Sequence, residues 1–324
     1  MLDPYSQSTI IQTSLIVIFT IGFTWTYLVE KFPNFAQVAL ASLSTIITYH
    51  LVNFYGWTPY QALPVTTIVG SLVGAILYIA IVRPMKRQSS LEISLTFTFF
   101  VLAIIIGSII SLYSYWFLIT KGYQTLGFIL SNFDFHYDGA PGIVYVAPTI
   151  ALILSILLVI LMKYGKQGIA IRAVAEDETL ARSLGINTFN IHLLSWLITG
   201  ALTGLAGGIL PLWTSTDLGF RDSFLIIVMA GSVVGGLESM TGAIIGGIIV
   251  SFTQKSLAIF LITNIGLSVG WFESLIPPLF IISVLMLYPN GIVEWITGPH
   301  NPKETLKVTF ISIRESLTKF IHTI

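Results

Sequence analysis

The sequence predicts an all-α polytopic integral membrane protein with about eight to nine transmembrane helices. Apolar residues make up 55% of the 324 residues and charged residues only 9%, a balance outside the range of soluble globular domains. The apolar residues also gather in runs of about 20, the length that an α-helix needs to cross roughly 30 Å of hydrocarbon. The bilayer is therefore expected to be the main solvent of this chain.

Nine apolar segments are candidates for transmembrane helices. No Lys or Arg precedes the first one, unlike a signal peptide, so it is expected to be retained as a span. The seventh is shorter than a full crossing and ends in Gly235 and Gly236, so a broken or re-entrant helix is the alternative there. In order, the candidates are Thr9–Val29, Asn34–Val52, Ala62–Val82, Ile93–Leu112, Val144–Met162, His192–Leu212, Phe224–Leu237, Gly242–Ile262 and Phe272–Tyr288.

The distribution of Lys and Arg predicts the orientation, because short cytoplasmic loops are enriched in both residues. With nine crossings and a cytoplasmic C-terminus, the external side keeps Lys121 and Arg221, with Lys255 near the outer end of a span. The residues that then fall on the cytoplasmic side are Lys31, Arg83, Lys86, Arg87, Lys163, Lys166, Arg172, Arg182, Lys303, Lys307, Arg314 and Lys319.

One polar segment, residues 163–190, interrupts the apolar sequence and is cytoplasmic in this topology. Within it, Asp177 can act as an N-cap, Glu178 lies in the first turn, and Gly185 stands where a left-handed residue ends a helix. These residues predict a helix of about two turns.

Leu180, Ala181 and Leu184 are expected to share one apolar face of this short helix. A helix of this length needs a surface to dock on, because isolated helices below roughly 12 residues are marginal in water. This helix has two possible positions. It lies on the bilayer surface or packs under its own bundle, or it projects as a rigid element that a soluble partner binds.

The last stretch of the chain predicts an amphipathic helix on the inner leaflet, or one that contacts a partner protein. Glu315 and Lys319 form an i, i+4 pair on its polar side. Its apolar residues recur at intervals of three and four: Leu306, Phe310, Ile313, Leu317, Phe320 and Ile324.

Glycines recur at four-residue spacing, which allows helix backbones to approach closely. Their concentration between Gly200 and Gly247 has two interpretations, helix packing or a path whose helices slide or break. The helix end at Gly235 and Gly236 could meet charged groups of a substrate.

No motif in the sequence supplies catalysis or an energy source. We find no GxxxxGK[ST] phosphate loop, no HExxH zinc pattern and no GxSxG nucleophile elbow, and we expect no catalytic, cofactor or metal site. The absence of cysteine removes disulfides and thiolate chemistry, and a net charge of zero gives no case for nucleic-acid binding. If the chain transports a solute actively, a partner must supply the energy. The helix between Asp177 and Gly185 is then the best candidate for the contact with that partner.

Several stretches share the pattern of a known family: RAVAEDETLARSLGIN from Arg172, LITGALTGLAGGIL from Leu197, VMAGSVVGGLESMTGAIIGGIIV from Val228, PNFAQ at 33–37 and VRPMKRQSSL at 82–91. Together they resemble the permease subunits of branched-chain amino acid ABC importers, the high-affinity leucine, isoleucine and valine systems. The family's arginine-alanine start and its alanine-x-x-x-glycine-isoleucine end are matched by Arg172, Ala173, Ala181, Gly185 and Ile186. The chain departs from the first signature at Gln37, Val38 and Ala39, where the family usually has a polar residue or glycine and often a histidine.

The resemblance covers roughly residues 32–291 and implies an ABC importer permease in the cell membrane. Residues 1–301 would form the transmembrane permease domain, with a coupling loop at 163–190, and residues 302–324 the cytoplasmic C-terminal helix. The implied partners are two ATP-binding subunits that hold ATP and Mg, a second homologous permease subunit and an external substrate-binding protein. The implied coupling residues are Asp177, Glu178, Leu180, Ala181, Leu184 and Gly185.

The translocation path is expected to carry a small zwitterion, and its candidate residues are Asn34, Gly204, Gly208, Gly231, Gly235, Gly236, Gly242 and Gly246. Three alternatives stay open. A permease of the same family could carry urea, amides or other amino acids, and a related ABC permease could carry a sugar or nucleoside. An ion-coupled carrier acting alone is the third, although no acidic pair recurs within a span as a cation relay requires.

Overall fold

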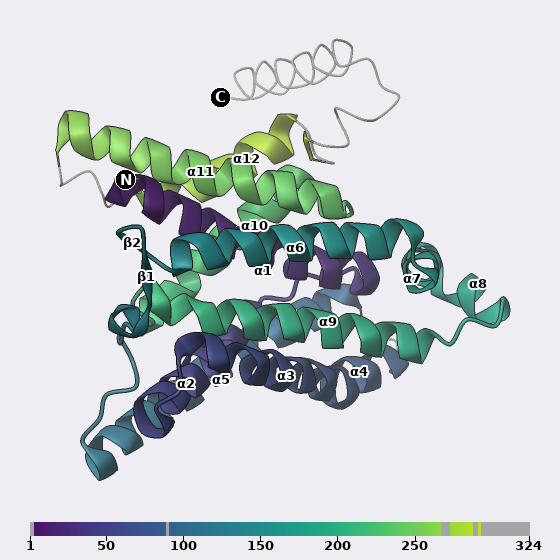
Figure 1. The fold of residues 1–324 in the computed structure, drawn as a ribbon. Coiled ribbons are helices and arrows are strands. Elements are labelled where there is room, and N and C mark those ends of the chain that lie inside the picture. The colour runs from purple at the N-terminus through teal and green to yellow at the C-terminus, as the bar shows by residue number, and fades with distance from the viewer. Residues whose placement is uncertain (1–2, 89–90, 267–272, 288–290, 293–324) are drawn as a thin grey trace, which may run out of the picture.

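A computed structural model of the chain describes residues 3–88, 91–266, 273–287 and 291–292, and these residues form a bundle of long helices with one short β-hairpin (Figure 1). The C-terminal helix predicted at 302–324 lies outside the described residues. The helices are α1 (Pro4–Glu30), α2 (Gln37–Tyr55), α3 (Pro59–Leu77), the π-helical η1 (Tyr78–Val82), α4 (Arg83–Arg87), α5 (Glu92–Lys121), the 3-10 helix η2 (Ser131–Phe133), α6 (Ile143–Tyr164), α7 (Lys166–Glu176), α8 (Glu178–Ser183), α9 (Thr188–Ile209), the 3-10 helix η3 (Leu210–Leu212), α10 (Leu218–Gly235), α11 (Met240–Ile265) and α12 (Ile276–Leu287).

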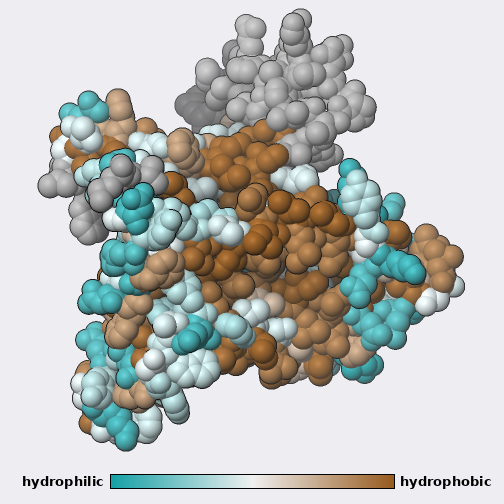
Figure 2. Space-filling view, in the orientation of Figure 1, coloured by the Kyte–Doolittle hydropathy of each residue, from teal (hydrophilic) through white to brown (hydrophobic). Residues whose placement is uncertain are grey.

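Each of the nine predicted spans overlaps a helix in the part of the chain that the structure describes. Within that part, seven helical segments are long and apolar enough to cross a membrane, and two shorter apolar helices, Ser223–Gly235 and Glu273–Met286, overlap the seventh and ninth predicted spans. The prediction of an all-α polytopic membrane protein is confirmed. Figure 2 shows the corresponding surface, a broad hydrophobic band with hydrophilic residues gathered toward both ends of the bundle.

The two ends of the bundle differ in structure and charge. One end, here the hairpin end, carries β1 (His136–Tyr137) and β2 (Ala140–Pro141), which pair antiparallel across a turn with positive φ at Asp138 and Gly139. The other end, here the α8 end, carries α4, α7 and α8 (Figure 1). The basic residues at the α8 end are Lys31, Arg83, Lys86, Arg87, Lys163, Lys166, Arg172 and Arg182, whereas Lys121 ends α5 at the hairpin end.

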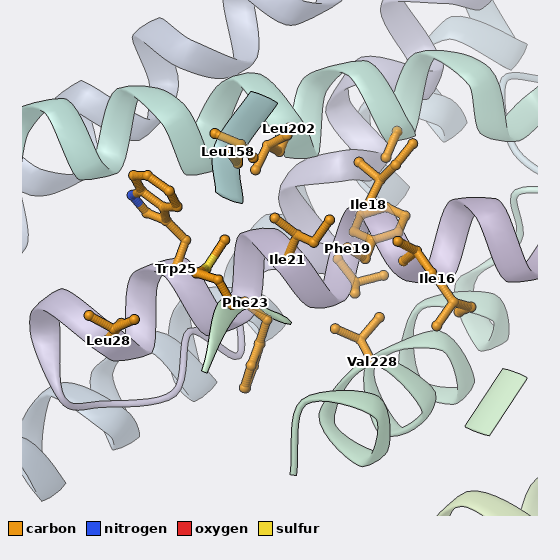
Figure 3. Packing of buried hydrophobic residues seen from close by; sticks show 14 of the residues in the cluster. Ile16, Ile18, Phe19, Ile21, Phe23, Trp25, Leu28, Leu158, Leu202 and Val228 are labelled. Carbon is orange, nitrogen blue, oxygen red and sulfur yellow. The ribbon is translucent and has the colours of Figure 1, made fainter. Parts of the chain in front are cut away.

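Helix α1 runs through the middle of the bundle and is buried on all sides. It contacts α6, α9, α10 and α11, and Figure 3 shows its side chains pointing in several directions, with Leu158 of α6, Leu202 of α9 and Val228 of α10 around it. Some of its threonines bond within the helix, as when the Thr20 hydroxyl donates to the carbonyl of Ile16 at 2.9 Å. An all-round apolar surface is what a fully enclosed helix requires.

Helix α10 crosses the bundle and does not turn back within it. It begins after Thr216, whose carbonyl accepts from the Gly127 amide at the hairpin end, 3.3 Å away. It ends before Glu238, whose carboxylate pairs with Lys31 at the α8 end at 2.7 Å. The re-entrant alternative is therefore not adopted. Gly236, with φ of +106°, follows the last residue of the helix and does not interrupt it.

The repeated glycines are contact points between helix backbones. A Cβ on Gly204 of α9 would overlap the carbonyl oxygen of Thr66 in α3, and a Cβ on Gly235 of α10 would overlap that of Gly242 in α11. Small residues of this kind let membrane helices pack without lipid between them. The contact between α3 and α9 is the most extensive helix pair in the described bundle, followed by α10 with α11.

Gly204→Ala should destabilise the fold by about 1–3 kcal/mol, the usual cost of overpacking, because the backbone of α3 leaves no room for a methyl group. The measurement is the thermal-unfolding midpoint of the purified protein in detergent. Ser108→Ala, on the exposed face of α5, is the control and should change stability by no more than about 0.5 kcal/mol. Equal midpoints for the two variants would show that α3 and α9 are not in close contact.

Candidate functional site

The short helix α8 is defined by its two caps. The Asp177 carboxylate accepts from the amides of Thr179 and Leu180 at 2.8 and 2.9 Å. At the other end Gly185 has φ of +86°, and the Ile186 amide donates to the carbonyl of Ala181 at 3.1 Å. The six-residue helix Glu178–Ser183 therefore begins and ends where the sequence places its caps.

The apolar face predicted for this helix is divided in the structure. Ala181 is 2% exposed and faces the bundle, whereas Leu180 is 57% and Leu184 72% exposed. Successive residues of an α-helix lie about 100° apart, so the buried face around Ala181 is narrow enough to leave Leu180 outside it, and Leu184 lies beyond the last helical residue. The two leucines point away from the protein, and Figure 2 shows a hydrophobic patch at the tip of the molecule over α8.

A second helix in the polar segment, α7, was not predicted. Ile171 and Val174 pack into the core on one face, and Gly168 lies so close to the end of α6 that a Cβ would overlap the carbonyl oxygen of Leu161. The spacing of Gly168, Ile171 and Val174 is the signal that identifies this face. Helix α7 contacts α1, α6 and α8, and so forms the rigid base from which α8 projects.

A histidine lies between the inner face of α8 and the end of α1. His192, near the start of α9, donates from Nδ1 to the Glu30 carboxylate at 2.9 Å. Its Nε2 lies 3.5 Å from the Glu178 carboxylate of α8. The imidazole therefore stands between two carboxylates, one on α8 and one at the end of α1.

Glu30 joins three further groups at the last residue of α1. Its side chain is fully buried, and Trp196 of α9 donates from Nε1 to the same oxygen that His192 contacts, at 2.9 Å. The other carboxylate oxygen lies 2.5 Å from the Lys86 ammonium of α4. A buried carboxylate is stable only when it is paired and hydrogen-bonded, and Glu30 meets both requirements.

The π-helical segment η1 aligns this cluster with α3. Tyr78, its first residue, stacks on the His192 ring with centroids 5.8 Å apart and an interplanar angle of 16°. Arg83 lies over the Phe189 ring at 4.4 Å from the centroid. A π-turn adds a residue to a helix and often marks a functional position, and here it brings the end of α3 against the start of α9.

Glu178 is held in its charged form by the groups around it. Burial raises the pKa of its carboxyl, but the electrostatic attraction of His192 and Lys86, with hydrogen bonds from Thr188 and Arg182, holds the pKa below its usual range. Arg182 also pairs with Glu178 along α8 at 2.8 Å.

The candidate path residues lie at contacts between helices and at a helix end, and these positions do not by themselves outline a channel. Gly204 and Gly208 meet α3, whereas four others meet at the crossing of α10 and α11, and Gly236 caps α10. Asn34 is fully buried between α1 and α2, with both amide atoms unpartnered. The four glycines at the crossing are Gly231, Gly235, Gly242 and Gly246.

Two cavities lie elsewhere in the described part of the bundle. One of about 1010 Å³ lies between α1, α6 and α11, and one of about 470 Å³ between α2, α5 and α10. Neither is lined by a candidate path residue, although Phe35, next to Asn34, and Val38, next to Gln37, line the smaller one. The assignment of the path stays a prediction. Among the described residues, no group of three His, Asp or Glu side chains could hold a metal ion.

The fold and the α8 loop together define a multi-pass membrane protein of the permease class, in which packed helices form the membrane body and a short capped helix projects from one end. The family model described as "Branched-chain amino acid transport system / permease component" matches residues 6–285. The chain belongs to this family and is a transport component, as the sequence motifs predicted.

Relatives agree over different lengths of the chain. A probable branched-chain amino acid transport permease protein, LivH, of Methanocaldococcus jannaschii is 34% identical over 291 residues, which cover 89% of this chain and 92% of the relative. LivH of the high-affinity branched-chain amino acid transport system of Escherichia coli is 28% identical over 50% of each chain. The ribose import permease protein RbsC of Haemophilus influenzae is 25% identical over 76% of this chain and 75% of its own.

The lowered pKa of Glu178 predicts a pH-dependent attachment of α8. Because the pKa is lower in the folded chain than in the unfolded one, the contribution is complete above the ordinary glutamate value of about 4.3 and is lost as pH falls through the lowered value. The protection factors of the amides of residues 181–186, which are corrected for the intrinsic pH dependence of hydrogen exchange, should therefore fall at acidic pH. Glu178→Gln keeps the Asp177 cap and should show a weaker pH dependence, whereas identical profiles would contradict a stabilising role for the Glu178 charge.

Proposed function

We propose that this chain is the membrane-spanning permease subunit of an ABC importer for branched-chain amino acids. The observation that carries the proposal is α8, a capped helix with exposed Leu180 and Leu184 on one face and Ala181 and Glu178 joined to the bundle on the other. A helix of this kind can receive a movement from a soluble partner and pass it on. The family and the relatives support the substrate class.

In this proposal the energy comes from partner subunits. Two ATP-binding subunits would hold ATP and Mg, and their closure would displace α8, because Leu180 and Leu184 would fill an apolar groove on one of them. The displacement would tilt the packed spans between inward-open and outward-open arrangements. The chain itself would catalyse no covalent step.

The charge distribution supports the sidedness. Eight described Lys and Arg residues lie at the α8 end, so by the positive-inside rule that end would be cytoplasmic, and nine crossings would leave the C-terminus on the same side. The ATP-binding subunits would then dock on α8 in the cytoplasm. An extracellular or periplasmic substrate-binding protein would deliver substrate to the hairpin end, and the membrane would be the plasma or inner membrane.

The path itself would be shared with a second homologous permease subunit. The glycine contacts of α10 with α11 and of α3 with α9 keep each pair close without long side chains, so each pair can move as one body. Asn34, with its unpartnered buried amide, and the helix end at Gly235 and Gly236 supply polar groups to such a path.

Changing Leu180 and Leu184 together to Asp should abolish association with the ATP-binding subunits and ATP-driven leucine uptake, because both side chains are exposed and leave the bundle unaltered. Association is measured by co-purification, and uptake in vesicles reconstituted with the complete complex. Thermal midpoints of the isolated chain should match the unmutated protein.

The control is Tyr137→Asp, a change of an exposed side chain at the hairpin end, which should leave association with the ATP-binding subunits intact. Unchanged uptake by the double variant would refute the coupling role of α8. Transport by the unmutated chain without any ATP-binding subunit would favour the ion-coupled carrier.

A sugar permease is the second candidate, because the similarity to a ribose import permease covers three quarters of the chain. The substrate class is tested by uptake of labelled leucine, isoleucine, valine, urea and ribose into vesicles that contain the complex and its binding protein. We expect the three branched-chain amino acids to be taken up and to compete with one another. Ribose or urea uptake that leucine does not inhibit would reassign the substrate.

A further inference from the structure

A cluster of polar side chains connects the exposed helix α8 to the centre of the bundle. This Glu30 cluster consists of Glu30, Lys86, Glu178, His192 and Trp196. We propose that Glu30 and His192 are positioning residues that carry a displacement of α8 into α1 and α4, so that ATP hydrolysis and transport remain coupled. The inference rests on the proposed function and deepens it, by naming the route from the docking helix to the spans.

The route begins at α8 with a charged contact. The Glu178 carboxylate lies 3.5 Å from Nε2 of His192, and Nδ1 of the same ring lies 2.9 Å from the Glu30 carboxylate. A rigid five-membered ring therefore separates the two carboxylates. A movement of Glu178 changes the electrostatic environment of the ring, and the ring is only 4% exposed, so little solvent screens the change.

The route continues from Glu30 in two directions. Lys86 ties the carboxylate to α4, which continues from α3 through η1, and Trp196 ties it to α9 one turn beyond His192. Tyr78 stacks on the imidazole from the η1 side and restricts its rotation. Because separating buried charges from their partners is costly, α1, α4 and the start of α9 are expected to follow one another.

Helix α1 is the element that can distribute this movement. Glu30 is its last residue, and from there α1 passes through the bundle to the hairpin end while contacting α6, α9, α10 and α11. Helix α9, which carries His192, also contacts α1, α2 and α3, so α1 and α9 together connect the cluster to most of the described bundle. A displacement at Glu30 therefore reaches the glycine crossing of α10 with α11.

A second ion pair at the same end provides a matched control. Lys31 and Glu238 are 2.7 Å apart and join the end of α1 to the loop between α10 and α11, but their side chains are 32% and 68% exposed. This pair does not include a residue of α8. Glu238→Gln therefore removes one carboxylate charge from the α8 end without interrupting the route through His192.

The experiment measures the number of leucine molecules transported per ATP hydrolysed by the complete complex in vesicles. Glu30→Gln keeps an oxygen that can accept from His192 and Trp196 but removes the charge, and should lower this ratio at least tenfold. Glu178→Gln leaves the buried part of the cluster in place and should lower it at least threefold, with ATP-binding subunits still co-purifying. Glu238→Gln should leave the ratio within twofold of the unmutated complex.

A double variant tests whether the two carboxylates act through the same ring. Glu30→Gln with Glu178→Gln should be no worse than Glu30→Gln alone, because effects on one route are not additive. Unchanged ratios in both single variants would overturn the inference, as would additive losses or a loss of ATPase association in Glu178→Gln. Should Glu30→Gln not fold, Glu178→Gln and His192→Gln carry the same test. Failure of the proposed function is distinguishable, because it would appear as no ATP-driven uptake by the unmutated complex.

Discussion

Enclosure of α1 by its neighbours is the constraint on which the rest of the bundle depends. In the most apolar stretch of this helix 89% of the residues are buried, compared with 28% in α5, which faces outward. In so enclosed a stretch, polar groups find hydrogen-bond partners only within the protein. Thr20 and Thr26 donate to carbonyls of their own helix, whereas Glu30 takes its partners from α4 and α9.

Local features of the sequence predicted much of this structure. The nine spans depend on apolar length, and the α8 caps on Asp177 and Gly185 depend on backbone geometry within a few residues. Long-range placement could not be predicted in the same way. Neither length nor Ser and Thr content distinguishes the central α1 from the peripheral α5, so the burial of α1 is a consequence of tertiary packing.

The cluster around Glu30 shows why the site was only half predicted. Glu178 was assigned to a coupling helix from its position, but Glu30 is a single acidic residue at the end of an apolar run, a position where a charge normally reaches the headgroup layer. Only the return of α9 and α4 to the same end of the bundle encloses it. In the same way, the burial of Ala181 and the exposure of Leu180 depend on where α7 directs α8, and no spacing within α8 contains that information.

The glycine contacts and the charged cluster constrain motion in complementary ways. Where backbones touch, as between α3 and α9 or between α10 and α11, sliding one helix along the other would bring bulkier residues into the space that glycine leaves, so each pair is expected to move as a body. Both pairs lie against α1 or against a helix that contacts it. In the proposed mechanism, a displacement of α8 would rotate these bodies about α1, and it would reach α1 through the enclosed carboxylate at the end of that helix.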